Sequence, residues 1–244
     1  MDNAVRARFS AHRADGLLSR AVSVPNAAPS QQLFDCSNPA ERERGLSAAA
    51  RAVRGGELVV MPTDTVYGLG CDAFNGTAVR GLLAAKRRGP DMPVGVLVGS
   101  WHTIDGLVTS VPQSARSLIE AFWPGEVSLV LEHAPSLAWD LGSTHGTVML
   151  RMPLHPVALE VLREVGPMAV SSANTSGNPP ASNVSEAITQ LAGSVGVYLD
   201  GGPSGDPVAS TIVDLTGVRP RLLRVGSVTA EQVEEVTGQE VDRP

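Results

Sequence analysis

From about residue 38 onward, the hydrophobic positions of this chain alternate between two kinds of pattern. A short apolar run such as Leu-Val-Val-Met at 58–61 is typical of a buried strand. The preceding stretch instead places Leu46, Ala50 and Val53 at helical spacing, with Pro39 suited to its first turn. Two glycines at 55–56 separate the two patterns. The sequence therefore predicts a helix, a tight turn and a strand as the first unit.

The same reasoning predicts the elements that follow. Helices are expected at 77–87, 112–122, 155–165, 183–192 and 229–237. Strands are expected at 94–98, 127–132, 147–151, 167–170, 196–199, 210–215 and 221–225. Strands and helices alternate without an internal repeat, and the short link between the last two strands suits an antiparallel pair. We therefore expect one α/β domain over 33–244, with a twisted, mixed parallel and antiparallel sheet and flanking helices.

Residues 1–32 do not share this periodicity. They contain Arg6, Arg8, Arg13 and Arg20 and a Pro/Ala/Ser/Gln run, without a lasting apolar period. We expect a disordered N-terminal extension. Its composition is compatible with an organelle transit peptide, with a native bacterial extension and with an upstream start site, and these alternatives stay open.

The composition of the 244-residue chain narrows the class of protein. Hydrophobic residues make up 43%, which suits a globular protein with a sizeable core. No stretch approaches the roughly 18 consecutive apolar residues of a membrane span. The two cysteines, Cys36 and Cys71, are too isolated for a disulfide framework or a CxxC metal site, which suits a reducing cytoplasm.

The charge of the chain points to a local anion site and away from a polyanion-binding surface. The formal net charge is −6, which disfavours a broad nucleic-acid surface. The chain has one lysine, Lys86, which stands in the cluster 86–88 about twenty residues after the segment 62–70. An ammonium is a compact point charge that reaches a single phosphate or carbamate oxygen more closely than a guanidinium fork does. A composition bias that removed the other lysines is the alternative explanation.

Polar segments follow or adjoin four of the predicted strands, where open α/β sheets build ligand crevices. They are 62–70, 86–93, 171–182 and 210–211. Thr147 and Arg151 have the same parity on one strand and are expected to face the same side. Hydroxyl, amide and cationic donors for an anionic substrate are supplied by Thr65, Thr147, Ser172, Asn174, Ser182, Ser210, Lys86, Arg88, Arg151 and Arg224.

Several of these residues also have a purely structural interpretation. Ser182 is most simply the N-cap of the helix at 183. Arg151 could pair with Glu160 or Glu164, and Arg224 could be an exposed arginine at a strand end. The chain has no Walker GxxxxGK[ST], strand-linked GxGxxG, GxSxG or HExxH motif, and its histidines lack metal-ligand spacing.

Taken together and in order, the segments resemble the YrdC/TsaC family, the threonylcarbamoyl-AMP synthases. The resemblance covers about 38–237. It rests on 62–70, Lys86-x-Arg88 followed by Pro93, Trp123-Pro124-Gly125, Arg151-Met152-Pro153, Ser172-Ala173-Asn174-x-Ser176-Gly177, Ser210-Thr211-Ile212-Val213-Asp214 and Leu223-Arg224-x-Gly226.

The resemblance implies a single YrdC-like domain around a deep, basic cavity. It also implies a nucleotidyltransferase that combines L-threonine, bicarbonate and ATP into threonylcarbamoyl-AMP and pyrophosphate. This product feeds t6A modification at position 37 of tRNA through a downstream threonylcarbamoyl transferase complex. Mg²⁺ would enter with ATP, and no protein-bound metal or protein nucleophile is implied.

The resemblance also divides the site residues into two groups. Threonine and bicarbonate are assigned to Thr65, Arg151, Ser172, Ser210 and Thr211. ATP is assigned to Lys86, Arg88, Thr147, Asn174, Ser182 and Arg224, of which Lys86 and Arg88 are also taken as catalytic.

The chain departs from the family pattern at several positions. The family usually has Gly and Pro where this chain has Arg87 and Gly89, His where it has Leu97, and Pro where it has Val225; the segment 205–209 also differs.

Two alternative functions remain open. One alternative is a double-stranded RNA or tRNA-binding module, against which the acidity and the scarcity of aromatic residues count. The other is a carbamoyl-adenylate-forming domain, although those domains lie in longer chains with zinc-finger cysteines.

Overall fold

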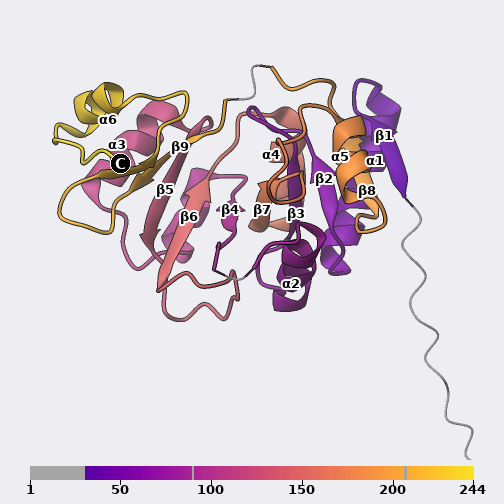
Figure 1. The fold of residues 1–244 in the computed structure, drawn as a ribbon, viewed down its shortest axis with the longest axis horizontal. Coiled ribbons are helices and arrows are strands. Elements are labelled where there is room, and N and C mark those ends of the chain that lie inside the picture. The colour runs from indigo at the N-terminus through magenta and orange to yellow at the C-terminus, as the bar shows by residue number, and fades with distance from the viewer. Residues whose placement is uncertain (1–30, 90, 206–207) are drawn as a thin grey trace, which may run out of the picture.

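The computed structural model describes residues 31–89, 91–205 and 208–244. These residues form one ten-stranded sheet with the strand order β1-β8-β2-β3-β7-β4-β6-β5-β9-β10 (Figure 1). The expected disordered extension lies outside the described residues, except at its end, where Gln32 already begins strand β1. The described part of the chain therefore begins at one edge of the sheet and reaches the opposite edge, β10, near its C-terminus.

The described part of the chain has the following elements. Its strands are β1 (Gln32–Asp35), β2 (Val59–Met61), β3 (Gly68–Asp72), β4 (Gly95–Leu97), β5 (Val127–Glu132), β6 (Thr147–Arg151), β7 (Met168–Ser172), β8 (Val197–Asp200), β9 (Thr211–Asp214) and β10 (Arg221–Arg224). Its helices are α1 (Pro39–Arg54), α2 (Gly76–Ala85), the 3-10 helix η1 (Trp101–Gly106), α3 (Gln113–Phe122), α4 (Pro156–Val165), α5 (Val184–Leu191) and α6 (Ala230–Thr237).

The predicted α/β fold with a mixed sheet is confirmed, and every predicted helix and strand is present with its ends within two residues of those expected. The last two strands, β9 and β10, are antiparallel as predicted. Three elements were not expected, namely β1, η1 and β3. Strand β3 reads as a loop in the sequence because Gly68 and Gly70 interrupt it, yet both glycines are buried in the sheet.

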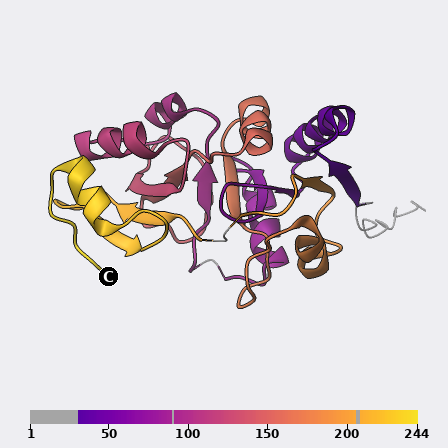
Figure 2. The same ribbon diagram turned by 90° about the horizontal axis from the view of Figure 1, so that it is seen from above.

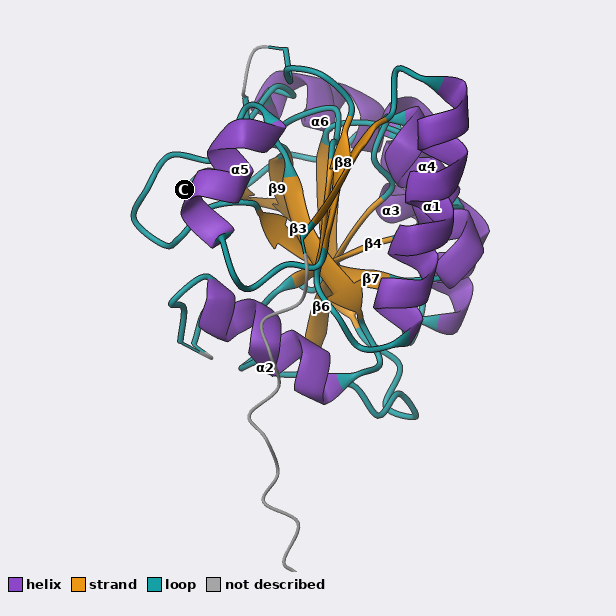
Figure 3. Cartoon of the chain, turned by 90° about the vertical axis from the view of Figure 1, so that its right-hand side faces the viewer, coloured by secondary structure: helices purple, strands orange, loops and turns teal. Residues whose placement is uncertain are grey.

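Helices cover both faces of the sheet. Along β2, the side chain of Val60 joins the larger hydrophobic cluster, whereas Val59 and Met61 join the smaller one on the other face. Helices α1 and α4 pack together over the smaller cluster, while α2 packs beside β3 and α5 beside β8 (Figure 3). Helices α3 and α6 pack on each other near β9, at the opposite end of the molecule from α1 (Figures 1 and 2).

The segments that flank β9 and β10 come very close to one another. Gly226 is the clearest case, because a Cβ atom there would lie 2.1 Å from the carbonyl oxygen of Ala209 and 2.6 Å from the carbonyl carbon of Ser210. Both neighbours are backbone atoms directly before β9. The segment after β10 can therefore touch the start of β9 only if residue 226 has no side chain.

We expect Gly226→Ala to destabilise the fold and to displace the start of β9, because the backbone atoms that it meets cannot rotate away. Overpacking of this kind typically costs about 1–3 kcal/mol, and urea denaturation measures it as a lower midpoint. Gly81→Ala is the matched control, because no atom lies within 4 Å of its added Cβ on α2. Its free energy of unfolding should stay the same or rise by up to about 1 kcal/mol. Equal losses in both variants would show that the contact at Gly226 is not limiting.

Candidate active site

A cavity of roughly 370 Å³ lies where the central strands and their loops meet. Residues of β3, β4, β5, β6, β7 and β9 contribute to its wall. The charged residues among the described lining are three arginines, Arg88, Arg151 and Arg224, and no lining residue is acidic. We call this the arginine cavity. Concentrated positive charge without a lining carboxylate favours an anionic ligand.

Arg151, the last residue of β6, is held by three oxygen atoms. Its Nε donates to the carbonyl oxygen of Gly125 at 2.8 Å, Nη1 to Thr65 Oγ1 at 3.0 Å and Nη2 to Asp64 Oδ1 at 2.6 Å. The alternative partners Glu160 and Glu164 are not used by Arg151. They pair with the helix α1 arginines, Arg42 and Arg54, each at 2.6 Å.

Arg88 reaches the cavity from the segment after α2. Its Nη1 donates to Ser171 Oγ at 3.2 Å and its Nη2 to the carbonyl oxygen of Pro93 at 3.1 Å. Its Nε is buried and has no partner among the described residues. Burial lowers the pKa of Arg88. This guanidinium therefore has unused donors in a partly dehydrated position, where an anion would gain most from them.

Lys86 lies beside the cavity and is not part of its lining. The residue is only 2% exposed, and its Nζ donates to the carbonyl oxygen of Ser172, to the carbonyl oxygen of Asn174 at 2.7 Å and to Asn174 Oδ1 at 3.2 Å. Its own carbonyl oxygen accepts from the backbone N–H of Ser176 at 2.8 Å. Lys86 thus fixes the turn at 172–176 from two sides.

The environment of Lys86 is unusual for a buried cation. Burial and the positive charge of Arg88 lower the pKa of Lys86 to about 8. The three oxygen acceptors match the three N–H donors of an ammonium group, so the charged form is the one that satisfies them all. The residue is therefore charged at neutral pH and adds to the positive potential beside the cavity.

Asn174 completes the turn that Lys86 holds. Its Nδ2 donates to the carbonyl oxygens of Thr175 at 3.0 Å and Asn178 at 2.7 Å, while Oδ1 accepts from Lys86. Ser172, two residues earlier, lines the cavity. The predicted pair of Ser172 and Asn174 is thus brought together with Lys86, with Ser172 toward the cavity and Asn174 within the supporting turn.

The third arginine is part of a hydroxyl cluster. Arg224 donates from Nε to the carbonyl oxygen of Ser210 at 2.9 Å and from Nη2 to Ser210 Oγ at 3.0 Å. Ser210 Oγ also lies 3.0 Å from Ser128 Oγ, and both hydroxyls are buried. Ser128 was not identified from the sequence. The available signal was a single serine inside the apolar run of β5, at 127–132.

Besides Lys86 and Asn174, three further predicted site residues do not line the cavity. Thr211 Oγ1 donates to the carbonyl oxygen of Val228 at 2.6 Å and accepts from two backbone N–H groups. Thr147 Oγ1 donates to the carbonyl oxygen of Thr144 at 2.8 Å. The expectation that Ser182 is a helix N-cap is wrong, because Asn183 caps α5 and Ser182 instead donates to Glu186.

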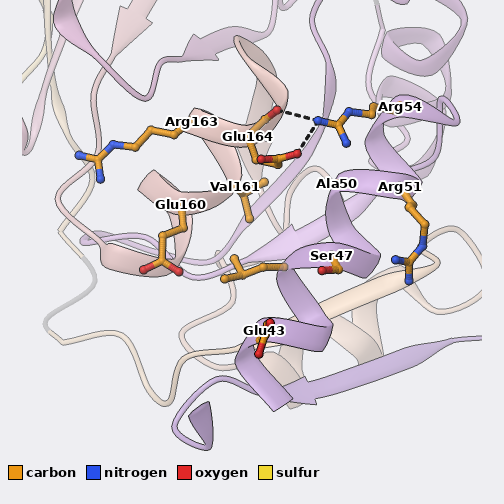
Figure 4. Close-up of a pocket in the computed structure, with 10 residues that line it drawn as sticks. Glu43, Ser47, Ala50, Arg51, Arg54, Glu160, Val161, Arg163 and Glu164 are labelled. Atoms are coloured by element: carbon orange, nitrogen blue, oxygen red, sulfur yellow. Dashed lines mark hydrogen bonds and ion pairs between the residues drawn. The ribbon is translucent and has the colours of Figure 1, made fainter. Parts of the chain in front are cut away.

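A second pocket lies between α1 and α4, away from these residues (Figure 4). Figure 4 shows Glu43, Glu160 and Glu164 alongside arginines of the same two helices, with Arg54 bonded to Glu164. Charges of both signs line this groove, so it lacks the one-sided potential of the arginine cavity. Among the described residues, no three His, Cys, Asp or Glu side chains gather into a metal site. None of the described helices has the length and apolar character needed to cross a bilayer.

The fold and the cavity define a mixed α/β domain with an arginine-lined cavity at the ends of its central strands. The chain belongs to the Sua5/YciO/YrdC family, whose model, described as telomere recombination, matches residues 51–226. The predicted family is thereby confirmed.

Relatives and solved structures agree with this assignment. A putative threonylcarbamoyl-AMP synthase of Mycobacterium tuberculosis is 64% identical over 207 residues, which cover 85% of this chain and 95% of the relative. The threonylcarbamoyl-AMP synthase of Bacillus subtilis is 39% identical over 195 residues, 79% of this chain and 56% of the relative. The crystal structure of Pyrococcus abyssi Sua5 complexed with L-threonine is 32% identical with a TM-score of 0.81, and the match covers 88% of this chain and 63% of that chain.

The departures from the family pattern have visible consequences in two places. Arg87, where a glycine is usual, has a φ of 53°, in the left-handed region that favours glycine. The chain thus keeps a glycine-like backbone between Lys86 and Arg88 at a cost in strain. Leu97 lines the cavity where a histidine is usual, so this wall is apolar.

We expect polyphosphate affinity to fall as pH rises through about 8, because an anion favours the charged form of Lys86 and its pKa lies there. Affinity is full below this pH, and the loss from pH 8 to pH 9 is at most roughly tenfold. Calorimetric titration with tripolyphosphate at pH 7, 8 and 9 measures it. The control is Lys86→Met, whose affinity should depend less steeply on pH. The α-amino group and the ligand also titrate, but they do so equally with both proteins. Identical pH dependence in the two proteins would exclude Lys86 as the titrating group.

Proposed function

We propose that this chain is an L-threonylcarbamoyladenylate synthase, which makes threonylcarbamoyl-AMP and pyrophosphate from L-threonine, bicarbonate and ATP. The observation that carries the proposal is the arginine cavity, which presents Arg88, Arg151 and Arg224 to a ligand without a lining acid. Two carboxylate- or phosphate-bearing substrates can be held there together. The names of the relatives supply the chemistry that fits this arrangement.

The threonine side of the site is formed around Arg151. Three of its five N–H donors are engaged by fixed oxygens, which leaves two for a substrate carboxylate. Thr65, Ser172 and Ser210 line the same cavity and offer hydroxyls to the substrate. Thr211 acts in this proposal by shaping the start of β9, since its hydroxyl already serves three backbone groups.

The ATP side is formed around Arg88 and Arg224, which would receive phosphate oxygens. Lys86 contributes positive charge from beneath the turn at 172–176, and Asn174 keeps that turn in shape. Thr147 and Ser182 belong to the proposed ATP side as well, at its margin. Mg²⁺ would be carried by ATP. Among the described residues, no cluster of acidic side chains forms a separate metal site.

The chemistry has two steps. The threonine amine first forms a carbamate with bicarbonate, with loss of water. A carbamate oxygen then attacks the α-phosphorus, and the bond from that phosphorus to the bridging oxygen breaks to release pyrophosphate. Catalysis comes from positioning and from neutralisation of the developing charge, and no protein nucleophile is used.

The product would serve a downstream threonylcarbamoyl transferase complex that acts on tRNA. We place the protein in the cytoplasm, where tRNA and ATP are available. Weak RNA binding is an outcome that a filter-binding titration with tRNA would detect, in comparison with ATP binding.

The decisive test is the dependence of pyrophosphate release on bicarbonate. If the carbamate is the nucleophile, release in rigorously CO₂-depleted buffer falls to background and returns on addition of bicarbonate. Amino acids without a β-hydroxyl should support little activity, because the cavity offers serine and threonine hydroxyls to that group. Mass spectrometry identifies the adenylate product. Robust release without bicarbonate would favour a simple aminoacyl-adenylating enzyme, and activity with carbamoyl phosphate would favour the carbamoyl-adenylate alternative.

We expect Arg151→Ala to raise the threonine KM more than the ATP KM. Truncation of one partner of a buried charge pair typically costs about 2–5 kcal/mol, and steady-state kinetics in each substrate measures the division. Arg42→Ala is the control, because Arg42 also pairs with a carboxylate but does not line the arginine cavity. That variant should leave both KM values unchanged. A raised ATP KM with an unchanged threonine KM would mean that the two sides of the site are reversed.

A further inference from the structure

Asp64 is an acid with a largely buried side chain, which bonds Arg151 of the arginine cavity without lining the cavity itself. Its side chain is 10% exposed and that of its partner Arg151 is 9% exposed. In the other ion pairs of the described residues, at least one side chain is 29% exposed or more. Asp64–Arg151 is therefore the pair that solvent screens least.

The contacts of Asp64 determine the plane of the guanidinium group. Asp64 Oδ1 accepts from Nη2 of Arg151 at 2.6 Å, and the adjacent Thr65 accepts from Nη1 at 3.0 Å. The third anchor, the carbonyl oxygen of Gly125, accepts from Nε at 2.8 Å. Each of the three guanidinium nitrogens thus donates to a different oxygen. Two of these oxygens, those of Asp64 and Thr65, belong to one turn after β2. The group has little freedom to rotate.

Asp64 also balances charge that the cavity concentrates. Burial, and after it the positive charge of Arg151, lowers the pKa of Arg224, because the two guanidinium groups repel each other. Asp64 is not among the lining residues, so it attracts Arg151 from behind without presenting negative charge to a ligand. Removal of this carboxylate would leave Arg151 free to move away from Arg224.

We propose that Asp64 is the positioning residue that aims the two free N–H donors of Arg151 at the substrate carboxylate. This inference rests on the proposed function and deepens it. It assigns part of the threonine affinity to a residue that does not touch threonine.

The substitution Asp64→Asn isolates the charge. An asparagine has nearly the same shape, and its Oδ1 can still accept from Nη2 of Arg151. Asp64 Oδ2 has no hydrogen-bond partner among the described residues, so the amide that replaces it breaks no second bond. We expect threonine KM, and threonine Kd by calorimetry, to rise on the order of tenfold, because the bond from Nη2 keeps its geometry but loses the carboxylate charge, which about halves its strength. The ATP KM should stay near its wild-type value.

Asp214→Asn is the matched control. Asp214 also pairs with an arginine, Arg221, at 2.8 Å, and its side chain is 11% exposed, but it does not line the arginine cavity. This variant should leave the threonine KM unchanged, and thermal melting of both variants records any general loss of stability. A threonine KM that rises in Asp64→Asn but not in Asp214→Asn, with an unchanged ATP KM, is a readout that a merely structural role would not produce.

The outcomes separate the two levels of the proposal. Equal threonine binding in wild type and Asp64→Asn, or an equal rise of both KM values, overturns the role of Asp64 and leaves the proposed function in place. A wild-type chain that neither binds threonine nor releases pyrophosphate with threonine and bicarbonate overturns the proposed function, and the role of Asp64 with it.

Discussion

The structure of this site depends on how mutually repelling cations are held side by side without neutralising carboxylates in the cavity. Backbone carbonyl oxygens do most of this. Those of Gly125, Pro93 and Ser210 accept from Arg151, Arg88 and Arg224, respectively, and those of the turn after β7 accept from Lys86. A carbonyl oxygen fixes a cation through a dipole and leaves its net charge intact. The cavity therefore stays positive, and one acid, Asp64, supports it from behind.

Carbonyl oxygens can serve in this way only because the strand ends lie close together. Each of these oxygens comes from a segment just before, after or at the end of a strand of the central sheet, where the regular pairing of the ladder ends. Gly226, which lies against the backbone of Ala209 and Ser210, allows the end of β10 to reach the start of β9. The anion site is thus a product of sheet topology, and helices α1 and α4 pack beside it on the same face of the sheet, since the cavity residue Leu97 also belongs to their hydrophobic cluster.

The sequence alone predicted those parts of the molecule that local pattern controls. Periodic apolar residues located α1, β5, β9 and β10, because burial on one face or on both sets the period directly, and the short link between β9 and β10 predicted that they are antiparallel. Strand β3 was missed since its two glycines serve close packing and carry no hydrophobic pattern. The family motifs named most residues around the cavity but not Asp64, whose partner is 87 positions away. Such a contact exists only after the sheet has formed, so no local rule contains it.

The single lysine of the chain can be understood from the same interactions. Lys86 meets three oxygens from only two residues, and a tetrahedral ammonium group can direct one N–H at each within a small space. A guanidinium group is planar and larger, and its fork is suited to two parallel acceptors, as in the pair of Arg224 with the carbonyl and hydroxyl oxygens of Ser210. The lysine and the arginines therefore have different roles, which follow from their shapes. The lysine closes the compact turn at 172–176, and the arginines span wider gaps while they keep donors free for a ligand. A compact cation is needed at position 86 because the turn at 172–176 closes around it. The three oxygen acceptors of this turn also favour the charged form of Lys86.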